Sequence, residues 1–154
     1  MFGCICPPKI DIPKIQKNEI ENSDCIFIGE VLKVYDDLTY KIKVIESLDG
    51  GDEIGNIYIG RNSGNCEPFI ENTGKWIIYA NNDNNLLEAN GCGISRSFEY
   101  PVIKPLAPPP AKLNDSTKSK EEQKADFIKL RQKSFQIGMS QLNSEISTLR
   151  KMRG

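Results

Sequence analysis

The stretch Cys4-Ile5-Cys6-Pro7-Pro8 decides how this chain is held together. Two cysteines that lie one residue apart cannot easily bond to each other, so each needs a partner far along the chain. Cys66 and Cys92 are the two candidates, and the residues alone leave the pairing open. Two such bridges would fasten an extended amino-terminal segment across a β-domain at two neighbouring points.

The composition is normal for a globular protein with one domain and an appendage. The chain has 154 residues, of which 38% are hydrophobic and 27% are charged. Its longest apolar runs are too short to cross a bilayer, so we expect no transmembrane segment. The absence of histidine excludes Ser-His-Asp and Cys-His nucleophilic catalysis and metal sites that contain histidine.

Five cysteines with long-range spacing favour an oxidising compartment. Met1-Phe2-Gly3, directly before Cys4, is typical of a chain start left where a signal peptide has been removed. We therefore expect a secreted or cell-envelope protein. A lipid on Cys4 is a further alternative, for which Gly3 is suitable and Phe2 is unusual.

Charge is distributed unevenly along the chain. From residue 111 onward there are ten Lys and Arg against five Asp and Glu, whereas residues 1–110 contain ten against sixteen. An acidic body and a basic tail attract each other, within one molecule or between copies; the alternative is a solvated helix with lysines on its wet face. The body lacks a basic face interleaved with aromatic residues, so we expect no nucleic-acid partner.

The first strands are the clearest local signal. Residues 25–35 are rich in β-branched and aromatic side chains, and Gly29 within them indicates a bulge or a sharp barrel bend. Residues 40–46 alternate between apolar and polar side chains, so the two segments are predicted to form a hairpin.

A short helix and three more strands complete the predicted domain. The helix is expected over residues 13–22, with Ile15 and Ile20 facing inward. The further strands are expected over residues 54–59, 75–80 and 86–89. Five short strands with even turn spacing predict a mainly β fold, a five-stranded Greek-key barrel of the OB type, over residues 4–100.

A proline-rich linker and a long helix follow the barrel. Prolines predict a stiff connector over residues 101–115, and residues 116–153 predict one helix with Ser116 or Thr117 as its cap. Its apolar residues form a heptad seam that is broken at Gln132. The seam residues are Ala125, Ile128, Phe135, Met139, Leu142, Ile146 and Leu149.

This helix would be about 50 Å long, more than the width of a small barrel. It must therefore overhang, bend near Gly138, or pair with another copy. Its seam either faces its own barrel or forms a self-association or partner-binding surface.

An ordered set of stretches gives the chain a resemblance to a known family. The set comprises Cys4-Ile5-Cys6-Pro7-Pro8, Asn22-Ser23-Asp24, residues 24–31, Cys66, Phe69, Gly74, residues 76–80 and Cys92. Over about residues 4–100 the chain resembles the N-terminal domain of tissue inhibitors of metalloproteinases. That domain belongs to the netrin-like OB-fold group, which has secreted bacterial relatives.

The resemblance implies a disulfide pairing. In the family pattern Cys4 would pair with Cys66, and Cys6 with Cys92. Cys25 is then left over, and its position in an apolar strand predicts a buried free thiol.

The resemblance also implies a mode of inhibition. In these inhibitors the first cysteine is the N-terminus, and its α-amine and carbonyl cap the catalytic zinc of the target protease. Carried over, Cys4 would chelate the zinc and Ile5 would enter the specificity pocket, while Cys6 and Pro7 would extend the contact ridge. The disulfide would hold the chelating group rigidly in place.

Several features depart from the family pattern. The third disulfide of the animal inhibitors is absent, and Glu21 lies near the position of its first cysteine. Ile5 replaces the usual small hydroxyl residue, the turn at Asp36-Asp37 is short, and the second subdomain is replaced by the linker and helix. Three residues precede Cys4, and an acylated nitrogen cannot chelate.

The other chemically suggestive residues are read as structural. The aromatic residues Tyr35, Tyr40, Tyr58 and Trp76 are expected in the core or in cross-strand pairs. Gly60 and Gly64 lack the lysine and hydroxyl residue of a phosphate-binding loop, and the turn aspartates predict no metal site.

Together these patterns favour a secreted, disulfide-stapled protein-binding or assembly module with no catalytic activity and no cofactor. The expected partner is another protein, or a second copy bound through the seam of the helix. The alternative is a metalloproteinase inhibitor whose ridge caps a catalytic zinc.

Overall fold

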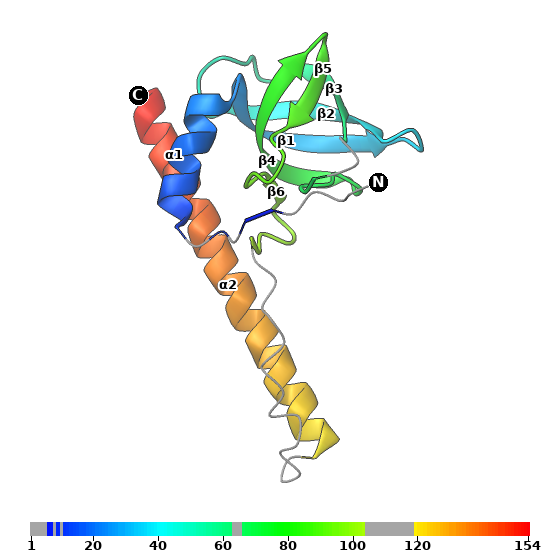
Figure 1. The fold of residues 1–154 in the computed structure, drawn as a ribbon, viewed down its shortest axis with the longest axis vertical. Helices are drawn as coiled ribbons and strands as arrows, with labels where there is room; N and C mark the ends of the chain where they lie inside the picture. Colours follow the sequence, from blue (N-terminus) through cyan, green and yellow to red (C-terminus); the bar gives the residue numbers. More distant parts are fainter. Residues whose placement is uncertain (1–5, 8, 10, 63–65, 104–118) are drawn as a thin grey trace.

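The computed structural model describes residues 6–7, 9, 11–62, 66–103 and 119–154. Within them the chain forms two helices and six strands (Figure 1). The helices are α1 (Ile12–Asn22) and α2 (Lys120–Arg153). The strands are β1 (Cys25–Val34), β2 (Thr39–Ser47), β3 (Ile57–Arg61), β4 (Gly74–Asp83), β5 (Leu86–Ala89) and β6 (Arg96–Ser97).

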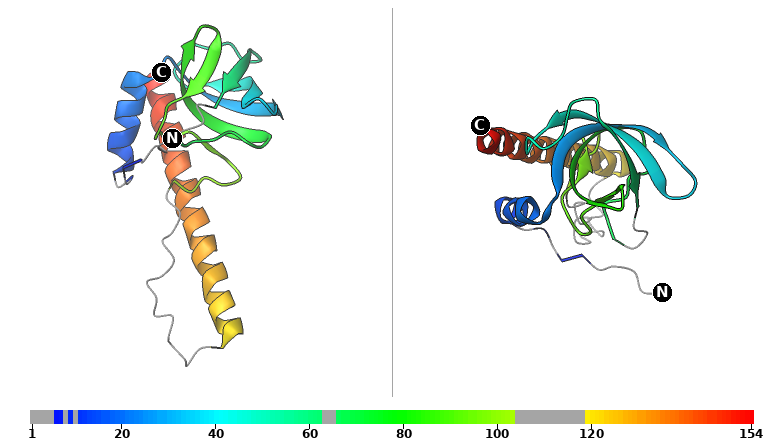
Figure 2. Two further views of the ribbon diagram at one scale, coloured as in Figure 1. Left: turned by 45° about the vertical axis from the view of Figure 1, so that its right-hand side comes forward. Right: turned by 90° about the horizontal axis from the view of Figure 1, so that it is seen from above.

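Five of these strands close into a barrel. β1, β2 and β3 are successive antiparallel neighbours, β3 pairs in parallel with β5, β5 pairs with β4, and β4 returns to β1. The predicted five-stranded barrel with a short N-terminal helix and a long C-terminal helix is thus confirmed. Figure 2 shows both helices on the same side of the barrel.

Two glycines make room for side chains inside the barrel. A Cβ at Gly29 would lie 2.7 Å from the Phe27 ring and 2.8 Å from the Ile42 side chain, and β1 shifts its register against β2 at this point. A Cβ at Gly60 would lie 2.1 Å from the Tyr40 ring. The bulge predicted at Gly29 is therefore present, and its cause is close packing inside the barrel.

The third strand starts later than its sequence pattern suggests. Gly55 has a φ of +91°, and the Asn56 amide donates a hydrogen bond to the Glu53 carbonyl, so a turn occupies these positions. The strand begins at Ile57, and Ile54, the predicted start, is 77% exposed. The apolar Ile54 suggested a strand at this position, but Gly55 adopts a left-handed conformation and allows a turn there.

The fourth strand is longer than predicted. β4 extends from Gly74 to Asp83, and the left-handed residues of the following turn are Asn84 and Asn85, with φ values of +50° and +66°. β6 was not predicted, because its two residues are too few to give a periodic signal. They pair with the part of β4 that also pairs with β1.

β1 and β4 are buried on both faces, which creates two apolar cores. The barrel interior contains Cys25, Phe27, Val31, Tyr40, Ile42, Val44, Ile70, Trp76, Ile78, Ala80 and Leu87. The outer core lies between these strands and α2, and contains Ile26, Ile28, Leu48, Ile77, Tyr79, Ile94, Leu142, Ile146 and Leu149. The apolar runs of β1 and β4 lack strict alternation because both faces of each strand are covered.

α1 forms as its sequence predicts. Asp11 is its N-cap, and its carboxylate accepts a hydrogen bond of 3.2 Å from the Lys14 amide. Pro13 lies in the first turn, where a missing amide hydrogen costs nothing. Ile15 and Ile20 are half-buried against the outer core, as predicted.

α2 is one continuous helix that projects well beyond the barrel (Figure 1). It begins at Lys120, and its N-cap is Ser119, whose side chain accepts a hydrogen bond from the Glu122 amide. The predicted caps Ser116 and Thr117 are therefore wrong, and both residues lie outside the described part of the chain. No helix in the described part of the chain is both long and apolar enough to cross a membrane.

The two halves of α2 should contribute very differently to stability. Leu142→Ala removes a side chain that is completely buried in the outer core, and we expect it to lower the free energy of unfolding by about 2–5 kcal/mol. Ile128→Ala, at a site that is 54% exposed, should change it by less than about 0.5 kcal/mol. Urea unfolding followed by circular dichroism measures both, and equal losses would contradict the docked arrangement.

Candidate functional site

The amino-terminal segment with the predicted protease-contact residues is only partly described by the structure. Cys6 forms a disulfide with Cys92, with their Cα atoms 5.3 Å apart. Cys66 is also disulfide-bonded, whereas its predicted partner Cys4 and the predicted pocket residue Ile5 lie outside the described residues. The Cys6–Cys92 bridge fastens the segment before α1 to the loop between β5 and β6.

Cys25 is a buried free cysteine, as predicted. Burial raises the pKa of its thiol to about 12, and the nearby carboxylates of Asp52, Asp49 and Asp24 add to this increase. The thiol is therefore protonated at neutral pH and serves as a small apolar group inside the barrel.

The described residues contain no group of three or more Cys, Asp or Glu side chains placed to hold a metal ion. The side chains that are brought together instead connect α2 to the barrel. The candidate functional site is accordingly α2 itself, and the contacts that fix its position determine what it presents to other molecules.

The predicted helix seam divides into two parts. Leu142, Ile146 and Leu149 are buried in the outer core and Met139 is half-buried against it. Ile128 and Phe135, by contrast, are 54% and 41% exposed. The later part of the seam is therefore buried against the barrel, whereas its earlier part faces solvent.

A buried ion pair fixes the docked half. Arg96 of β6 forms a salt bridge with Glu145 of α2, and only 7% and 2% of their side chains is exposed. Arg96 also donates to the main-chain carbonyls of Pro101 and Ile94, at 2.9 and 2.8 Å. Two opposite charges at this depth stabilise a defined helix position only because their hydrogen bonds are satisfied.

The same cluster connects α1 and β4 to α2. The Tyr79 hydroxyl donates to Glu145 Oε1 at 3.1 Å, and Gln16 Nε2 donates to the Glu145 carbonyl at 3.1 Å and to the Tyr79 oxygen at 3.4 Å. Burial, together with the neighbouring carboxylate, raises the pKa of Tyr79, so its hydroxyl stays protonated and can donate. Both α1 and β4 are thus connected to α2 at Glu145, β4 through its carboxylate and α1 through its main-chain carbonyl.

A close crossing marks the region where α2 leaves the barrel. A Cβ at Gly138 would lie 2.9 Å from the Pro101 carbonyl oxygen and 3.2 Å from the Val102 nitrogen. The glycine therefore allows the chain after β6 to cross the helix without bending it. Of the three alternatives for the long helix, the structure shows the overhang: α2 continues through Gly138 and projects beyond the barrel (Figure 1).

Charged contacts hold the carboxyl end of α2. Arg150 donates to both oxygens of Glu46, at 2.7 and 2.8 Å, and Arg153 approaches the same carboxylate at 3.1 Å. Hydrogen bonds from Arg150 and then Arg153, with the charges of both, hold the pKa of Glu46 at about 2, below its ordinary value of 4.5. The last turn is therefore paired with the end of β2.

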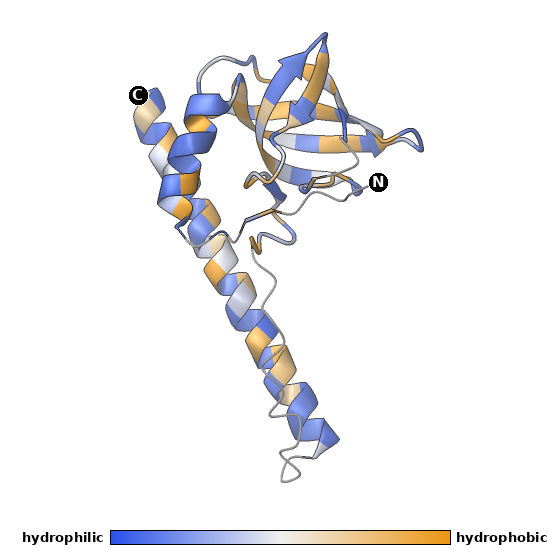
Figure 3. Ribbon diagram, viewed as in Figure 1, coloured by the Kyte–Doolittle hydropathy of each residue, from blue (hydrophilic) through white to orange (hydrophobic). Residues whose placement is uncertain are grey.

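The projecting half of α2, residues 120–137, carries exposed apolar side chains. The exposed fractions are 55% for Phe127, 54% for Ile128, 41% for Phe135 and 50% for Ile137. Apolar residues recur along this projecting part of the helix in Figure 3. An isolated helix of this length is only marginally stable in water, so such a segment gains most when it packs on a partner.

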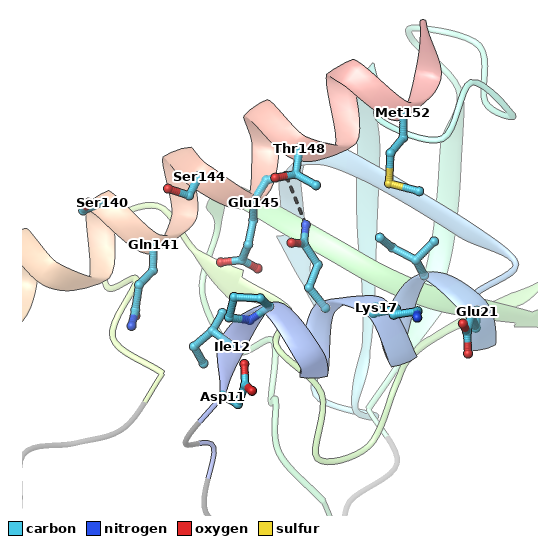
Figure 4. A pocket seen from close by; sticks show the side chains of 13 residues that line it. Asp11, Ile12, Lys17, Glu21, Ser140, Gln141, Ser144, Glu145, Thr148 and Met152 are labelled. Atoms are coloured by element: carbon cyan, nitrogen blue, oxygen red, sulfur yellow. Dashed lines mark hydrogen bonds between the residues drawn. The ribbon is translucent and has the colours of Figure 1, made fainter.

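A groove runs between α1 and the docked half of α2. Figure 4 shows side chains from both helices around it. Its volume is about 980 Å³. On the α2 side the lining includes Ser140, Ser144 and Thr148, and on the α1 side it includes Ile12 and Ile20. Gln141, Glu145 and Met152 of α2 line it as well.

Sequence reasoning missed the Arg96–Glu145 pair. The two residues are 49 positions apart, and Arg96 lies in a two-residue strand without a pattern. The available signal was the position of Glu145 beside the apolar seam residue Ile146. A charge there indicates a partner but does not say which one.

No family model matches the sequence, and no curated protein is detectably similar to it. The resemblance to metalloproteinase inhibitors therefore stays a prediction.

Substitutions in the Arg96–Glu145 pair test directly how α2 is held on the barrel. Arg96→Met should lower the free energy of unfolding by about 3–5 kcal/mol, because it leaves the Glu145 carboxylate buried without its counter-ion. The double variant Arg96→Met, Glu145→Leu should be less destabilised than the sum of the two single variants. Chemical unfolding of the four proteins gives the coupling energy, and simple additivity would contradict a buried, coupled pair.

The Glu46 contacts should make stability depend on acid. Because the folded-state pKa is below the ordinary value, the carboxylate stabilises the fold fully above about pH 4.5 and loses this contribution as the pH falls toward 2. Glu46→Gln should lower the free energy of unfolding by about 1 kcal/mol at neutral pH. This difference in stability from the wild type should disappear as the pH falls to about 2. Glu53→Gln, at an exposed loop residue, is the matched control; thermal unfolding across this pH range measures both.

Proposed function

We propose that this protein is a non-catalytic assembly module in which the barrel holds α2 and its projecting half binds a second copy of the same chain. The observation that carries the proposal is the exposed apolar surface of residues 120–137, at the end of a helix whose other half is firmly docked.

Charge supports a second copy as the partner. The body of the chain is acidic and its tail is basic. The basic last turn of α2 already pairs with its own barrel through Glu46, whereas Lys120, Lys124 and Lys129 lie on the half that projects away from it (Figure 1). These lysines are therefore better placed to meet acidic groups of another molecule than those of their own barrel.

The fixed position of α2 on the barrel supports a binding role as well. An interaction helix loses less conformational freedom on binding when its position is already fixed. Glu145 connects α2 with β6, β4 and α1, and the C-terminal arginines hold its last turn. The projecting half therefore leaves the barrel in a defined direction.

We also propose that the protein acts in an oxidising compartment, outside the cell or in its envelope. Cys6 and Cys92 are 86 residues apart in the sequence, so their disulfide closes a long loop. Disulfides of this kind persist in secreted and envelope proteins and are rare in the cytosol. An assembly module exposed there would benefit from a bridge that limits unfolding.

Point substitutions on the projecting half test the assembly role without removing the outer core. Sedimentation equilibrium from low to high micromolar concentration should show the mass rising from 17.3 kDa toward that of a dimer. The variant Phe127→Ser, Ile137→Ser should associate at least about ten-fold more weakly, because two large apolar contacts are lost. Gln136→Ser, an exposed polar site on the same helix, is the control.

Circular dichroism should show that all three proteins retain their helix. A wild-type chain that stays monomeric throughout, or a double variant that associates as the wild type does, would overturn the proposal.

A further inference from the structure

α2 carries a second line of residues, distinct from the seam that packs on the barrel. Its first part includes Phe127, Leu130 and Ile137, which follow one another at heptad-like intervals. Continued at the same intervals, the line reaches Gln141, Ser144 and Thr148, which border the groove beside α1. One face of α2 is therefore an apolar ridge in its first half and the wall of a groove in its second half.

The ridge and the groove are complementary in size. The ridge has large side chains, and about half of Phe127 and of Ile137 is exposed. The groove lining on α2 combines the small Ser140, Ser144 and Thr148 with larger residues, and the lining on α1 includes the apolar Ile12 and Ile20 among polar residues. Large apolar residues inserted between small ones give close packing of helices.

We propose, building on the assembly role proposed above, that the groove between α1 and α2 receives the projecting half of α2 from a second copy. The two α2 helices run antiparallel, and the exchange is reciprocal, so that each copy gives its ridge and receives the ridge of the other. A two-fold axis passes close to Ile137, where the ridge gives way to the groove wall.

The lengths of the two parts are compatible with this exchange. Residues 120–137 form a segment about 27 Å long, and residues 140–152, which border the groove, span about 20 Å. The projecting half is thus long enough to cover the whole groove of its partner. Both sites lie on the same helix, so one symmetric contact uses them twice.

The charges of α2 select the antiparallel arrangement. Its first turn contains Glu121 and Glu122, and its last turn contains Lys151 between Arg150 and Arg153. Because Arg150 and Arg153 pair with Glu46 of their own barrel, Lys151 is the residue of this turn that we assign to the contact with the other copy. Antiparallel pairing places the first turn of one copy beside the last turn of the other, so opposite charges meet. A parallel pair would place acid beside acid and base beside base.

α1 adds further complementarity at the edge of the groove. Asp11 lines the end of the groove that is nearer the middle of α2, and Lys17 lines it farther along α1 (Figure 4). In the antiparallel arrangement the basic residues Lys129 and Lys133 of the incoming helix approach the Asp11 end. Its acidic first turns then approach the end lined by Lys17 and by the acidic Glu21, so the charge complementarity at α1 rests on the Asp11 end.

A substitution that fills the groove tests the acceptor site without altering the ridge. Ser144→Tyr places a large side chain in the groove, and we expect the dissociation constant of the dimer to rise at least about ten-fold. Ser147→Tyr introduces the same side chain on the same helix at an exposed position outside this groove, and should leave the dimer unchanged. Sedimentation equilibrium measures both, with thermal unfolding as the check on folding.

Charge reversal tests the orientation. Glu122→Lys and Lys151→Glu should each weaken the homodimer several-fold, because in the antiparallel pair each change creates two repulsive contacts. Mixing the two variants should restore association, since both contacts become attractive in the heterodimer. In a parallel pair neither single variant would weaken the homodimer, so that result would overturn the proposed arrangement.

The outcomes separate this inference from the assembly role. If the variant Phe127→Ser, Ile137→Ser weakens the dimer while Ser144→Tyr behaves like Ser147→Tyr, the assembly role holds and the groove is not the acceptor. If neither the ridge nor the groove variants alter the mass, both proposals fail. Weakening by Ser144→Tyr, with rescue in the mixed charge variants, supports the reciprocal exchange.

Discussion

The packing of α2 on the outer face of β1 and β4 is the contact on which the remaining structure depends. A small barrel buries little apolar surface in its interior alone, and here the outward side chains of two central strands are also covered. Leu142, Ile146 and Leu149 supply that cover. The helix is therefore part of the domain core, although the proline-rich stretch before it would suggest an independent appendage.

The Arg96–Glu145 pair gives this apolar contact a defined position. Hydrophobic packing tolerates small shifts of a helix along its axis, because neighbouring turns offer similar side chains. A buried carboxylate that must meet one guanidinium and one tyrosine hydroxyl does not tolerate such shifts. The direction in which the other half of α2 projects is thus set by polar contacts inside the protein.

The barrel was predictable because its signals are local. Gly29 marks a bulge, the alternation in β2 marks a half-buried strand, and Pro13 marks the start of α1. The division of α2 was not predictable, because Phe135 and Leu142 are equivalent in any periodic pattern. Only the extent of the barrel face decides which of them is buried, and that extent depends on contacts between residues far apart in the sequence.

Other misses have the same cause. A bend near Gly138 was one of three alternatives for the long helix, whereas the glycine allows the chain at Pro101 to cross the helix closely. Arg96 gave no signal, because its partner is supplied by the end of the chain. In the candidate site, the sequence could identify the apolar seam but not the groove, whose existence depends on how α1 and α2 are spaced.

The order of the elements, with α2 after the strands that it covers, also has a consequence for biosynthesis. β1 and β4 leave the ribosome well before residues 142–149, so Ile26, Ile28, Ile77 and Tyr79 have no helix to cover them while synthesis continues. A barrel that closed early would present an apolar sheet face to the crowded surroundings of the nascent chain. The outer core is completed only by α2, and the time between the emergence of β4 and that of α2 is when the chain most needs a chaperone.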